Sequence, residues 1–462
     1  MPTTVGELRA AGHEPRGVRT EIRDNLLAAL RAGRDPWPGI VGFDDTVLPR
    51  LERALIAGHD VVLLGERGQG KTRLLRSIVD LLDEWTPVID GAELGEHPLQ
   101  PITPASRRRA AELGDGLPVA WRHRSERYAE KLATPDTSVG DLVGDVDPVK
   151  VAEGRSLGDP ETIHYGLVPR AHRGIVTVNE LPDLAERIQV ALLNVMEERD
   201  IQIRGYLLRL PLDVLLVASA NPEDYTNRGR IITPLKDRFG AEIRTHYPPE
   251  LTDEVALVRQ EADLVAAVPG HLLEVCARFA RYLRETPEVD QRSGVSARFA
   301  IAGAETVAAA ALRRAAISGE AEPVARPVDL EGVPHVLRGK LEFESGIESS
   351  DEEDVTDLLV HLLRRSVADA ARARLAGIDL TPLAETVGAG HRVITGADVP
   401  AEQIVAAVPA AGVVSDVLHR LGVGEGDAPG HAASAIELAC ESLYLAQRLA
   451  KDVDDEGRSV FS

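Results

Sequence analysis

The chain contains few cysteines and few aromatic side chains. Only Cys276 and Cys440 occur among 462 residues, too few for a disulfide framework or a cysteine-rich zinc site. Both lie in stretches rich in Ala and Leu, so we expect buried and unreactive thiols. Aromatic residues make up 3% of the sequence, against 44% for all hydrophobic residues. The core is therefore expected to be built mainly from Ala, Leu and Val.

A long apolar run and an excess of positive charge are also missing. No run approaches the roughly 18–20 apolar residues that span a bilayer, so we expect no membrane segment. The first residues lack the basic and apolar regions of a signal peptide, which predicts a cytoplasmic protein. The formal net charge is −22, and an acidic surface repels a phosphate backbone. The composition therefore argues against nonspecific nucleic-acid binding.

The sequence does contain a stretch, residues 65–72, that matches the pattern of a phosphate-binding loop. This stretch, Gly-Glu-Arg-Gly-Gln-Gly-Lys-Thr, fits the pattern G-x-x-x-x-G-K-[ST]. An apolar run at 60–64, typical of a short buried strand, precedes it, and a helical pattern at 72–82 follows it. Glycines let the backbone N–H groups of such a loop gather around phosphate oxygens. The glycines expected to bind nucleotide are Gly65, Gly68 and Gly70.

The last two residues of the loop supply the side chains for nucleotide chemistry. Lys71 is expected to reach the β- and γ-phosphates, and the Thr72 hydroxyl to coordinate Mg²⁺. The alternative is a glycine-rich turn that matches by accident. Four fixed positions recur by chance on the order of once in a hundred chains of this length. The loop therefore predicts ATP and Mg²⁺ as cofactors.

Residues 39–42 offer a second candidate contact with the nucleotide. The backbone of Val41 and Gly42 would close over the adenine ring. Because Pro36 and Pro38 come just before, a Pro/Gly turn without a ligand explains the same residues equally well. Both interpretations remain open.

Two further strand-like runs end in polar side chains. The apolar run at 174–180 ends in Asn179 and Glu180. A parallel strand beside the phosphate loop would place these two side chains next to Mg²⁺ and the attacking water. The run at 210–218 is followed by Asn221, which would hold the hydrolytic water. A turn-forming Asn before a proline is the alternative for Asn221.

Together these pieces resemble the AAA+ ATPases, and within them the motor subunit of magnesium chelatase and its MoxR-like relatives. The resemblance covers residues 37–316 and matches 65–72 to the Walker A loop and 174–180 to the Walker B strand. The long gap between these two elements is also similar to that group. The implied fold is an α/β P-loop core with a parallel sheet, followed by an all-α lid and a helical C-terminal extension.

The resemblance also implies roles for particular side chains. Glu180 becomes the general base, Asn221 becomes sensor 1 and Arg298 becomes sensor 2. Arg238, in the sequence Asp-Arg-Phe, becomes the arginine finger. These roles imply a hydrolase in which ATP lies between neighbouring subunits.

The family's mode of action implies partners for the chain. Its members form homo-oligomeric rings, typically hexamers, which remodel a partner protein with the energy of ATP. A partner with a von Willebrand A-type domain is implied as a separate polypeptide, since this chain has no Asp-x-Ser-x-Ser metal pattern. Neither nucleic acid nor a membrane is expected as a partner. General remodelling is favoured over metal insertion into a porphyrin.

The sequence departs from the family at Asn179, where Walker B normally carries Asp. An Asn keeps a carbonyl acceptor for metal-bound water but contributes no negative charge. We therefore expect weaker Mg²⁺ affinity and slow hydrolysis. A nucleotide-gated assembly scaffold with weak or absent hydrolysis is the alternative function. A DNA helicase or transcription activator is disfavoured by the acidic charge and the lack of a DNA-binding domain.

The expected domain organisation has four parts. They are an N-terminal helical segment at 1–36, an α/β nucleotide-binding domain at 37–247 with an insertion at 93–173, a helical lid at 248–318, and a helical C-terminal extension at 319–462. Ser296 is expected to cap a helix at 297–316. Residues 319–328 are predicted to be a Pro/Glu-rich linker. The acidic run at 350–353 is predicted to be a capping box that opens a long helix.

Overall fold

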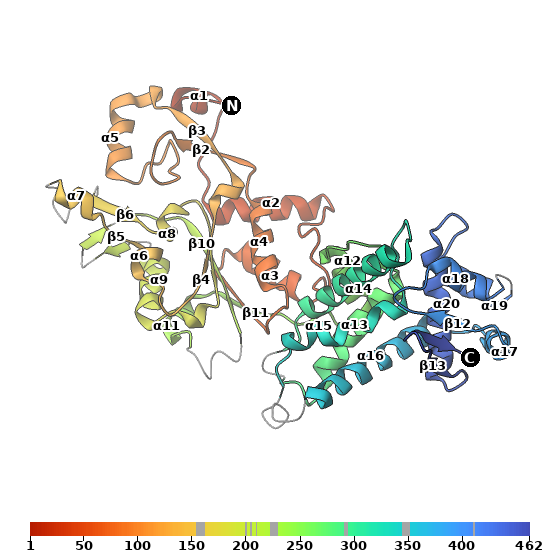
Figure 1. Ribbon diagram of the computed structural model, residues 1–462. Helices are drawn as coiled ribbons and strands as arrows, with labels where there is room; N and C mark the ends of the chain where they lie inside the picture. Colours follow the sequence, from red (N-terminus) through yellow and green to blue (C-terminus); the bar gives the residue numbers. More distant parts are fainter. Residues whose placement is uncertain are drawn as a thin grey trace. The chain divides into compact units, whose positions relative to one another are not determined.

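The computed structural model describes most of the chain, and its helices and strands are drawn in Figure 1. The described residues are 1–153, 162–198, 201–203, 206–208, 210–221, 230–290, 294–343, 352–409 and 412–462. They divide into two compact units, residues 1–246 and residues 247–462. Each unit has its own hydrophobic core. Among the described residues, no helix combines the length and the apolar character needed to cross a membrane.

A parallel five-stranded sheet forms the centre of the first unit. Its strand order is β11-β1-β10-β7-β4, and every neighbouring pair is parallel. The strands are β1 (Val61–Leu64), β4 (Tyr128–Leu132), β7 (Gly174–Asn179), β10 (Val214–Ala220) and β11 (Ala241–Arg244). The register places Leu64 opposite Ala220 and Leu132 opposite Asn179. The residues that follow β1, β7 and β10 therefore meet at one edge of the sheet, where open α/β sheets bind ligands.

Helices cover both faces of this sheet, as Figure 1 shows. One face packs against α2 (Val18–Arg31), α3 (Val47–Ala57) and α4 (Lys71–Ser77), and the other against α9 (Glu186–Glu198) and α11 (Thr233–Arg238). Leu63 lies in the hydrophobic core on the face covered by α2, α3 and α4, and Val62 lies in the core on the face covered by α9 and α11. This alternation explains why the strands read as continuous apolar runs, since both of their faces are buried.

Shorter elements complete the first unit, including three antiparallel strand pairs, β2–β3, β5–β6 and β8–β9. These elements are α1 (Val5–Ala10), η1 (Ile78–Leu81), β2 (Trp85–Ile89), α5 (Pro104–Leu113), η2 (Gly114–Gly116), β3 (Val119–His123), η3 (Arg124–Arg127), α6 (Val139–Leu142), β5 (Gly144–Val146), α7 (Pro148–Ala152), β6 (Ile163–Tyr165), α8 (Leu167–Arg170), η5 (Leu181–Asp183), β8 (Ile201–Ile203) and β9 (Tyr206–Leu208).

Three expectations for the first unit need correction. The predicted insertion at 93–173 contains β4, which is an edge strand of the central sheet. Its sequence, Tyr-Ala-Glu-Lys-Leu, lacks the apolar run that identified the other strands. In the N-terminal segment, where the sequence predicts one helix at 19–31, the structure has α1 as well as α2. The helix predicted at 72–82 is α-helical only to Ser77 and continues as the 3-10 turn η1.

The second unit is mostly helical. Its helices are α12 (Leu251–Glu261), α13 (Gly270–Glu285), α14 (Ala297–Ser318), η6 (Pro327–Leu330), α15 (Val333–Leu337), η7 (Arg338–Lys340), α16 (Glu352–Arg374), α17 (Thr381–Gly388), α18 (Ala401–Ala407), α19 (Val413–Arg420) and α20 (Pro429–Leu445). A small antiparallel sheet, which the sequence did not predict, joins them in the order β12-β14-β13. Its strands are β12 (Val393–Thr395), β13 (Lys451–Val453) and β14 (Ser459–Phe461).

Several smaller expectations concern this unit. Both cysteines are buried free thiols, as predicted, and burial raises the pKa of Cys276 to about 12. Ser296 occupies the N-cap position of α14, but its side chain makes no capping hydrogen bond there. The capping box expected at 350–353 begins outside the described residues. The division between a lid and a C-terminal extension stays a prediction.

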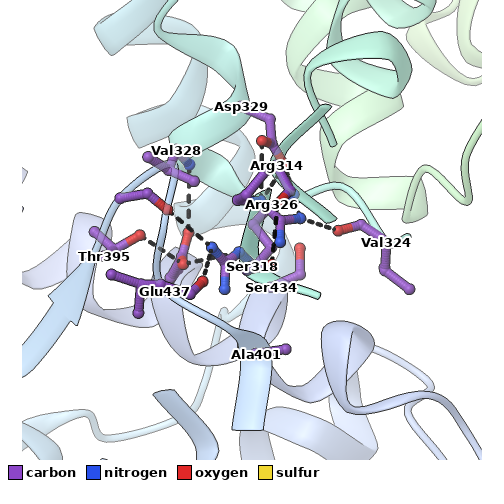
Figure 2. A network of polar contacts seen from close by, with 12 residues as sticks. Arg314, Ser318, Val324, Arg326, Val328, Asp329, Thr395, Ala401, Ser434 and Glu437 are labelled. Carbon is purple, nitrogen blue, oxygen red and sulfur yellow. Dashed lines mark hydrogen bonds and ion pairs between the residues drawn. The ribbon is translucent and has the colours of Figure 1, made fainter. Parts of the chain in front are cut away.

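A buried network of charges replaces the linker expected at 319–328 (Figure 2). The Arg314 guanidinium lies 3.1 Å from an oxygen of Asp329 and 2.8 Å from one of Glu320. Arg326 has no exposed surface, and its Nε lies 3.3 Å from Oε1 of Glu437 on α20. Burial raises the pKa of the Asp329 and Glu437 carboxyls. The network joins the end of α14 to α20. Its charged groups lie close to one another because charges taken out of water need close partners.

Replacing Arg326 with Met is expected to lower the free energy of unfolding of the second unit by about 3–5 kcal/mol, because buried Glu437 would lose its charged partner. Urea unfolding followed by the helical circular dichroism signal measures this change. All three tryptophans, Trp37, Trp85 and Trp121, lie in the first unit, so their fluorescence reports that unit independently.

The matched control is Arg372→Met. The Arg372 side chain is 78% exposed and pairs with Asp369 at the surface, so its loss is expected to cost less than about 1 kcal/mol. Equal unfolding midpoints for the Arg326 and Arg372 variants would contradict a stabilising role for the network.

Candidate functional site

The phosphate-binding loop has the backbone that its sequence predicts. Gly68 and Gly70 adopt φ values of 75° and 73°, in the left-handed region that favours glycine. A Cβ atom at Gly65 would lie 1.9 Å from Oγ1 of Thr245, so no larger residue fits there. Helix α4 begins at Lys71, directly after the loop. The loop is thus a close-packed turn that leads from β1 into a helix, the arrangement typical of a phosphate-binding nest.

Lys71 connects this loop to the end of β10. Its Nζ atom donates hydrogen bonds to the carbonyl oxygens of Gly65 and Glu66 and to Oδ1 of Asn221, the last at 2.9 Å. Lys71 is 7% exposed and Asn221 is 5% exposed. Two residues that are far apart in the sequence therefore meet at the carboxyl edge of the sheet, and their roles as phosphate lysine and sensor 1 stay predictions. Thr72 follows in the first turn of α4 and is half-buried.

The end of β7 contributes Asn179 and Glu180. Asn179 is 6% exposed; its Nδ2 donates to Oε1 of Glu130 at 2.7 Å, and its Oδ1 accepts from the hydroxyl of Ser219 at 3.1 Å. Glu180 has φ 55° and ψ 46°, a left-handed conformation that is uncommon for a residue other than glycine. Such strained residues cluster at functional sites, and this one lies where the general base was predicted.

Two functional candidates were missed in the sequence, Glu130 on β4 and Arg76 on α4. Arg76 donates to both carboxylate oxygens of Glu130, at 2.7 and 2.9 Å. The Tyr128 hydroxyl donates to the same carboxylate at 3.0 Å. The Arg76 guanidinium holds the pKa of Glu130 below its usual range. Recognition of β4 as a strand would have placed Tyr128 and Glu130 on one face, because strand side chains alternate.

The remaining predicted residues have other surroundings. Val41 and Gly42 are half-buried in the loop before α3, and Gly42 has a φ of 79°; adenine binding there stays a prediction. Arg238 ends α11, and its half-exposed guanidinium pairs with Glu197 near the end of α9. Arg298 is exposed on α14 in the second unit. The roles of both arginines at the nucleotide stay predictions.

The available ligands suit Mg²⁺ bound together with a nucleotide. Within the described part of the chain, no cluster of three or more His, Cys, Asp or Glu side chains has the arrangement of a metal site. A P-loop metal needs no such cluster, because one hydroxyl and the phosphates supply its oxygens. Thr72 offers that hydroxyl, and Asn179 offers a carboxamide oxygen for metal-bound water. These residues fit the metal.

Comparison with known proteins supports the same interpretation. A family model described as the Sigma-54 interaction domain matches residues 154–238, less than a fifth of the chain. The magnesium-chelatase subunit ChlI of Guillardia theta is 30% identical over 236 residues, which cover 49% of this chain and 63% of the relative. The chloroplastic ChlI of Nicotiana tabacum is 30% identical over 254 residues, which cover 53% and 56%. The chain thus spans less than two thirds of these relatives.

Solved structures give similar matches. A structure of the complex between subunits BchI and BchD of magnesium chelatase is 22% identical, with a TM-score of 0.37, and the match covers 68% of this chain and 98% of that one. RuvB of Thermotoga maritima is 13% identical, with a TM-score of 0.38, and the match covers 91% and 93%. The sheet order, the phosphate loop and the sequence relatives together show that the chain is similar to the AAA+ ATPases, and among them to the magnesium-chelatase subunit ChlI.

Proposed function

We propose that the protein binds ATP with Mg²⁺ and hydrolyses it as an AAA+ motor. The observation that carries this proposal is the 2.9 Å contact between Nζ of Lys71 and Oδ1 of Asn221. It joins the phosphate loop to the strand end where a water-orienting side chain is needed. Asn179 ends β7, the strand next to β10 in the sheet, and Glu180 follows it directly, so the side chains proposed for hydrolysis share one edge.

Each side chain has a defined task in this proposal. Lys71, now held by the carbonyl oxygens of its own loop, would exchange them for β- and γ-phosphate oxygens, since a charged phosphate attracts the ammonium more strongly. Glu180 would accept a proton from the attacking water, and Asn221 would orient that water. Thr72 would hold Mg²⁺, which when bound neutralises charge on the β- and γ-phosphates.

The finer parts of the proposal concern assembly. We propose a homo-oligomeric ring, expected to be a hexamer, in which Arg238 reaches a neighbour's phosphates and Arg298 responds from the lid. The curated relatives are named as subunits, which supports work within a larger assembly. A separate partner with a von Willebrand A-type domain, and remodelling of that partner, complete the proposal. Insertion of a metal into a porphyrin is not part of it.

The test uses Glu180→Gln, which keeps the shape of the side chain but removes the base. This variant is expected to bind ATP normally and to release phosphate about 10²–10⁴ times more slowly, the usual contribution of a general base. Steady-state phosphate release at saturating Mg²⁺ and ATP measures the change. Glu186→Gln, at an exposed position in the first turn of α9, is the control and should match the parent.

Two results would count against hydrolysis through Glu180. Equal rates in the parent and the Glu180 variant would remove Glu180 as the base. A parent protein that binds ATP but releases no phosphate with Mg²⁺ would favour the assembly scaffold instead.

A further inference from the structure

A continuous chain of hydrogen bonds runs along the edge of the sheet from α4 to the candidate base. Arg76 donates to the carboxylate of Glu130, which accepts from Nδ2 of Asn179 at 2.7 Å. The Ser219 hydroxyl donates to Oδ1 of Asn179 at 3.1 Å and accepts from the backbone N–H of Glu180 at 3.3 Å. The chain therefore crosses three neighbouring strands, β4, β7 and β10.

Glu130 determines that the NH₂ group of the Asn179 carboxamide faces β4 and that its oxygen faces β10. An ionised carboxylate can only accept hydrogen bonds, so the Asn179 atom beside it must be the NH₂ group. Ser219 does not impose this choice, because a hydroxyl both donates and accepts. The Asn179 oxygen consequently faces β10. Since β10 lies between β7 and β1, the oxygen points to the side of the sheet from which the phosphate loop emerges.

Glu130 itself is well placed to keep this orientation. Its side chain is 22% exposed and is held by both nitrogens of the Arg76 fork and by the Tyr128 hydroxyl. A fork of this kind fixes the plane of a carboxylate. Arg76 also lies on α4, one turn beyond Thr72. The helix that carries the Thr72 hydroxyl, the expected Mg²⁺ ligand, therefore also holds Glu130 in place.

We propose that Glu130 is a positioning residue that acts through Asn179, orienting its carboxamide oxygen toward metal-bound water at the phosphate loop. The inference rests on the proposed binding of ATP with Mg²⁺. In this proposal, the Asn in Walker B forms a hydrogen-bonded pair with Glu130 on the neighbouring strand, and the two side chains depend on each other. From the sequence alone, the same Asn is expected only to remove a negative charge from the metal site.

The pairing of Asn179 with Glu130 predicts an effect of Asn179→Asp on Mg²⁺ binding opposite to the one that the sequence suggests. From the sequence, Asn179→Asp should strengthen Mg²⁺ binding by restoring a charge. In the structure, that substitution would place a carboxylate oxygen 2.7 Å from a carboxylate oxygen of Glu130, and like charges at that distance repel. The change should become favourable only with Glu130→Gln, whose amide donates to the new carboxylate while its oxygen still accepts from Arg76.

A double-mutant cycle tests the proposal with a fluorescent, slowly hydrolysed ATP analogue. We expect Asn179→Asp and Glu130→Gln each to raise the Mg²⁺ concentration for half-maximal analogue binding by about tenfold, and the double variant to return close to the parent. With EDTA in place of Mg²⁺, all four proteins should bind the analogue equally, because the phosphate loop is unchanged. A merely structural role would instead weaken binding under both conditions. Glu126→Gln, an exposed position near β4, is the control.

The outcomes separate this inference from the proposed function. A parent that binds the analogue neither with Mg²⁺ nor with EDTA would overturn the proposed function. If the parent binds it but Asn179→Asp alone needs less Mg²⁺, or if the double variant is no better than Asn179→Asp, the positioning role of Glu130 is wrong. Equal Mg²⁺ dependence in all four proteins would overturn it as well.

Discussion

Lys71→Ala is expected to lose most of its affinity for ATP. The triphosphate would then face only backbone N–H groups, and Asn221 would lose the ammonium that now donates to it. Loss of one partner from a close charged contact costs about 2–5 kcal/mol, which corresponds to roughly 30- to several-thousand-fold in the dissociation constant. Titration calorimetry with ATP and Mg²⁺ measures this loss directly.

The control for this experiment is Lys236→Ala, which removes a half-exposed lysine paired with Glu242 and should leave affinity unchanged. Tryptophan fluorescence shows whether the first unit of each variant is folded. Unaltered ATP binding by a folded Lys71→Ala protein would remove the phosphate-loop assignment, and the proposed function with it.

Arg238→Ala is expected to bind ATP and assemble normally but to hydrolyse ATP about 10³–10⁵ times more slowly. An arginine supplied by a neighbouring subunit stabilises charge on the transferred phosphoryl group, and its loss has an effect of this size. The Arg238 side chain is 49% exposed and pairs with Glu197 of its own chain. In the proposed ring it would leave Glu197 for the neighbour's phosphates.

Two comparisons decide whether Arg238 acts on a neighbouring subunit. Mixing Arg238→Ala with Lys71→Ala should recover phosphate release, because some mixed interfaces combine an intact loop with an intact arginine. Mixed assemblies that form but release no phosphate would show that Arg238 does not act in trans. Glu197→Gln should remain active, so an equal loss in that variant would mean that Arg238 serves only its structural ion pair.

The phosphate loop and the strands β1, β7 and β10 were predictable because their signals are local. The glycines of the loop are needed for the backbone of the loop itself, as the positive φ values of Gly68 and Gly70 demonstrate. The strands β1, β7 and β10 are buried on both faces and therefore appear as apolar runs in the sequence. Buried Cys276 follows in the same way from its apolar surroundings.

Other features depended on contacts between distant parts of the chain. Strand β4 has an edge position and a mixed sequence, so only its pairing with β7 makes it recognisable. The charged residues at 319–328 resemble a solvated linker, yet Arg326 is buried because Glu437, more than a hundred residues later, lies beside it. Residue types alone do not distinguish an edge strand from a loop, or a buried charged residue from one in a solvated linker.

The sequence by itself determined that a nucleotide-binding loop follows a buried strand, and that Asn179 and Glu180 end another. Only the tertiary structure decided what these side chains meet. Lys71 reaches Asn221 and Asn179 reaches Glu130 because parallel pairing brings the ends of β1, β10, β7 and β4 to one edge. The strand order and register that create these contacts are set by packing on both faces of the sheet, since a shift of one residue would turn every buried side chain to the opposite face.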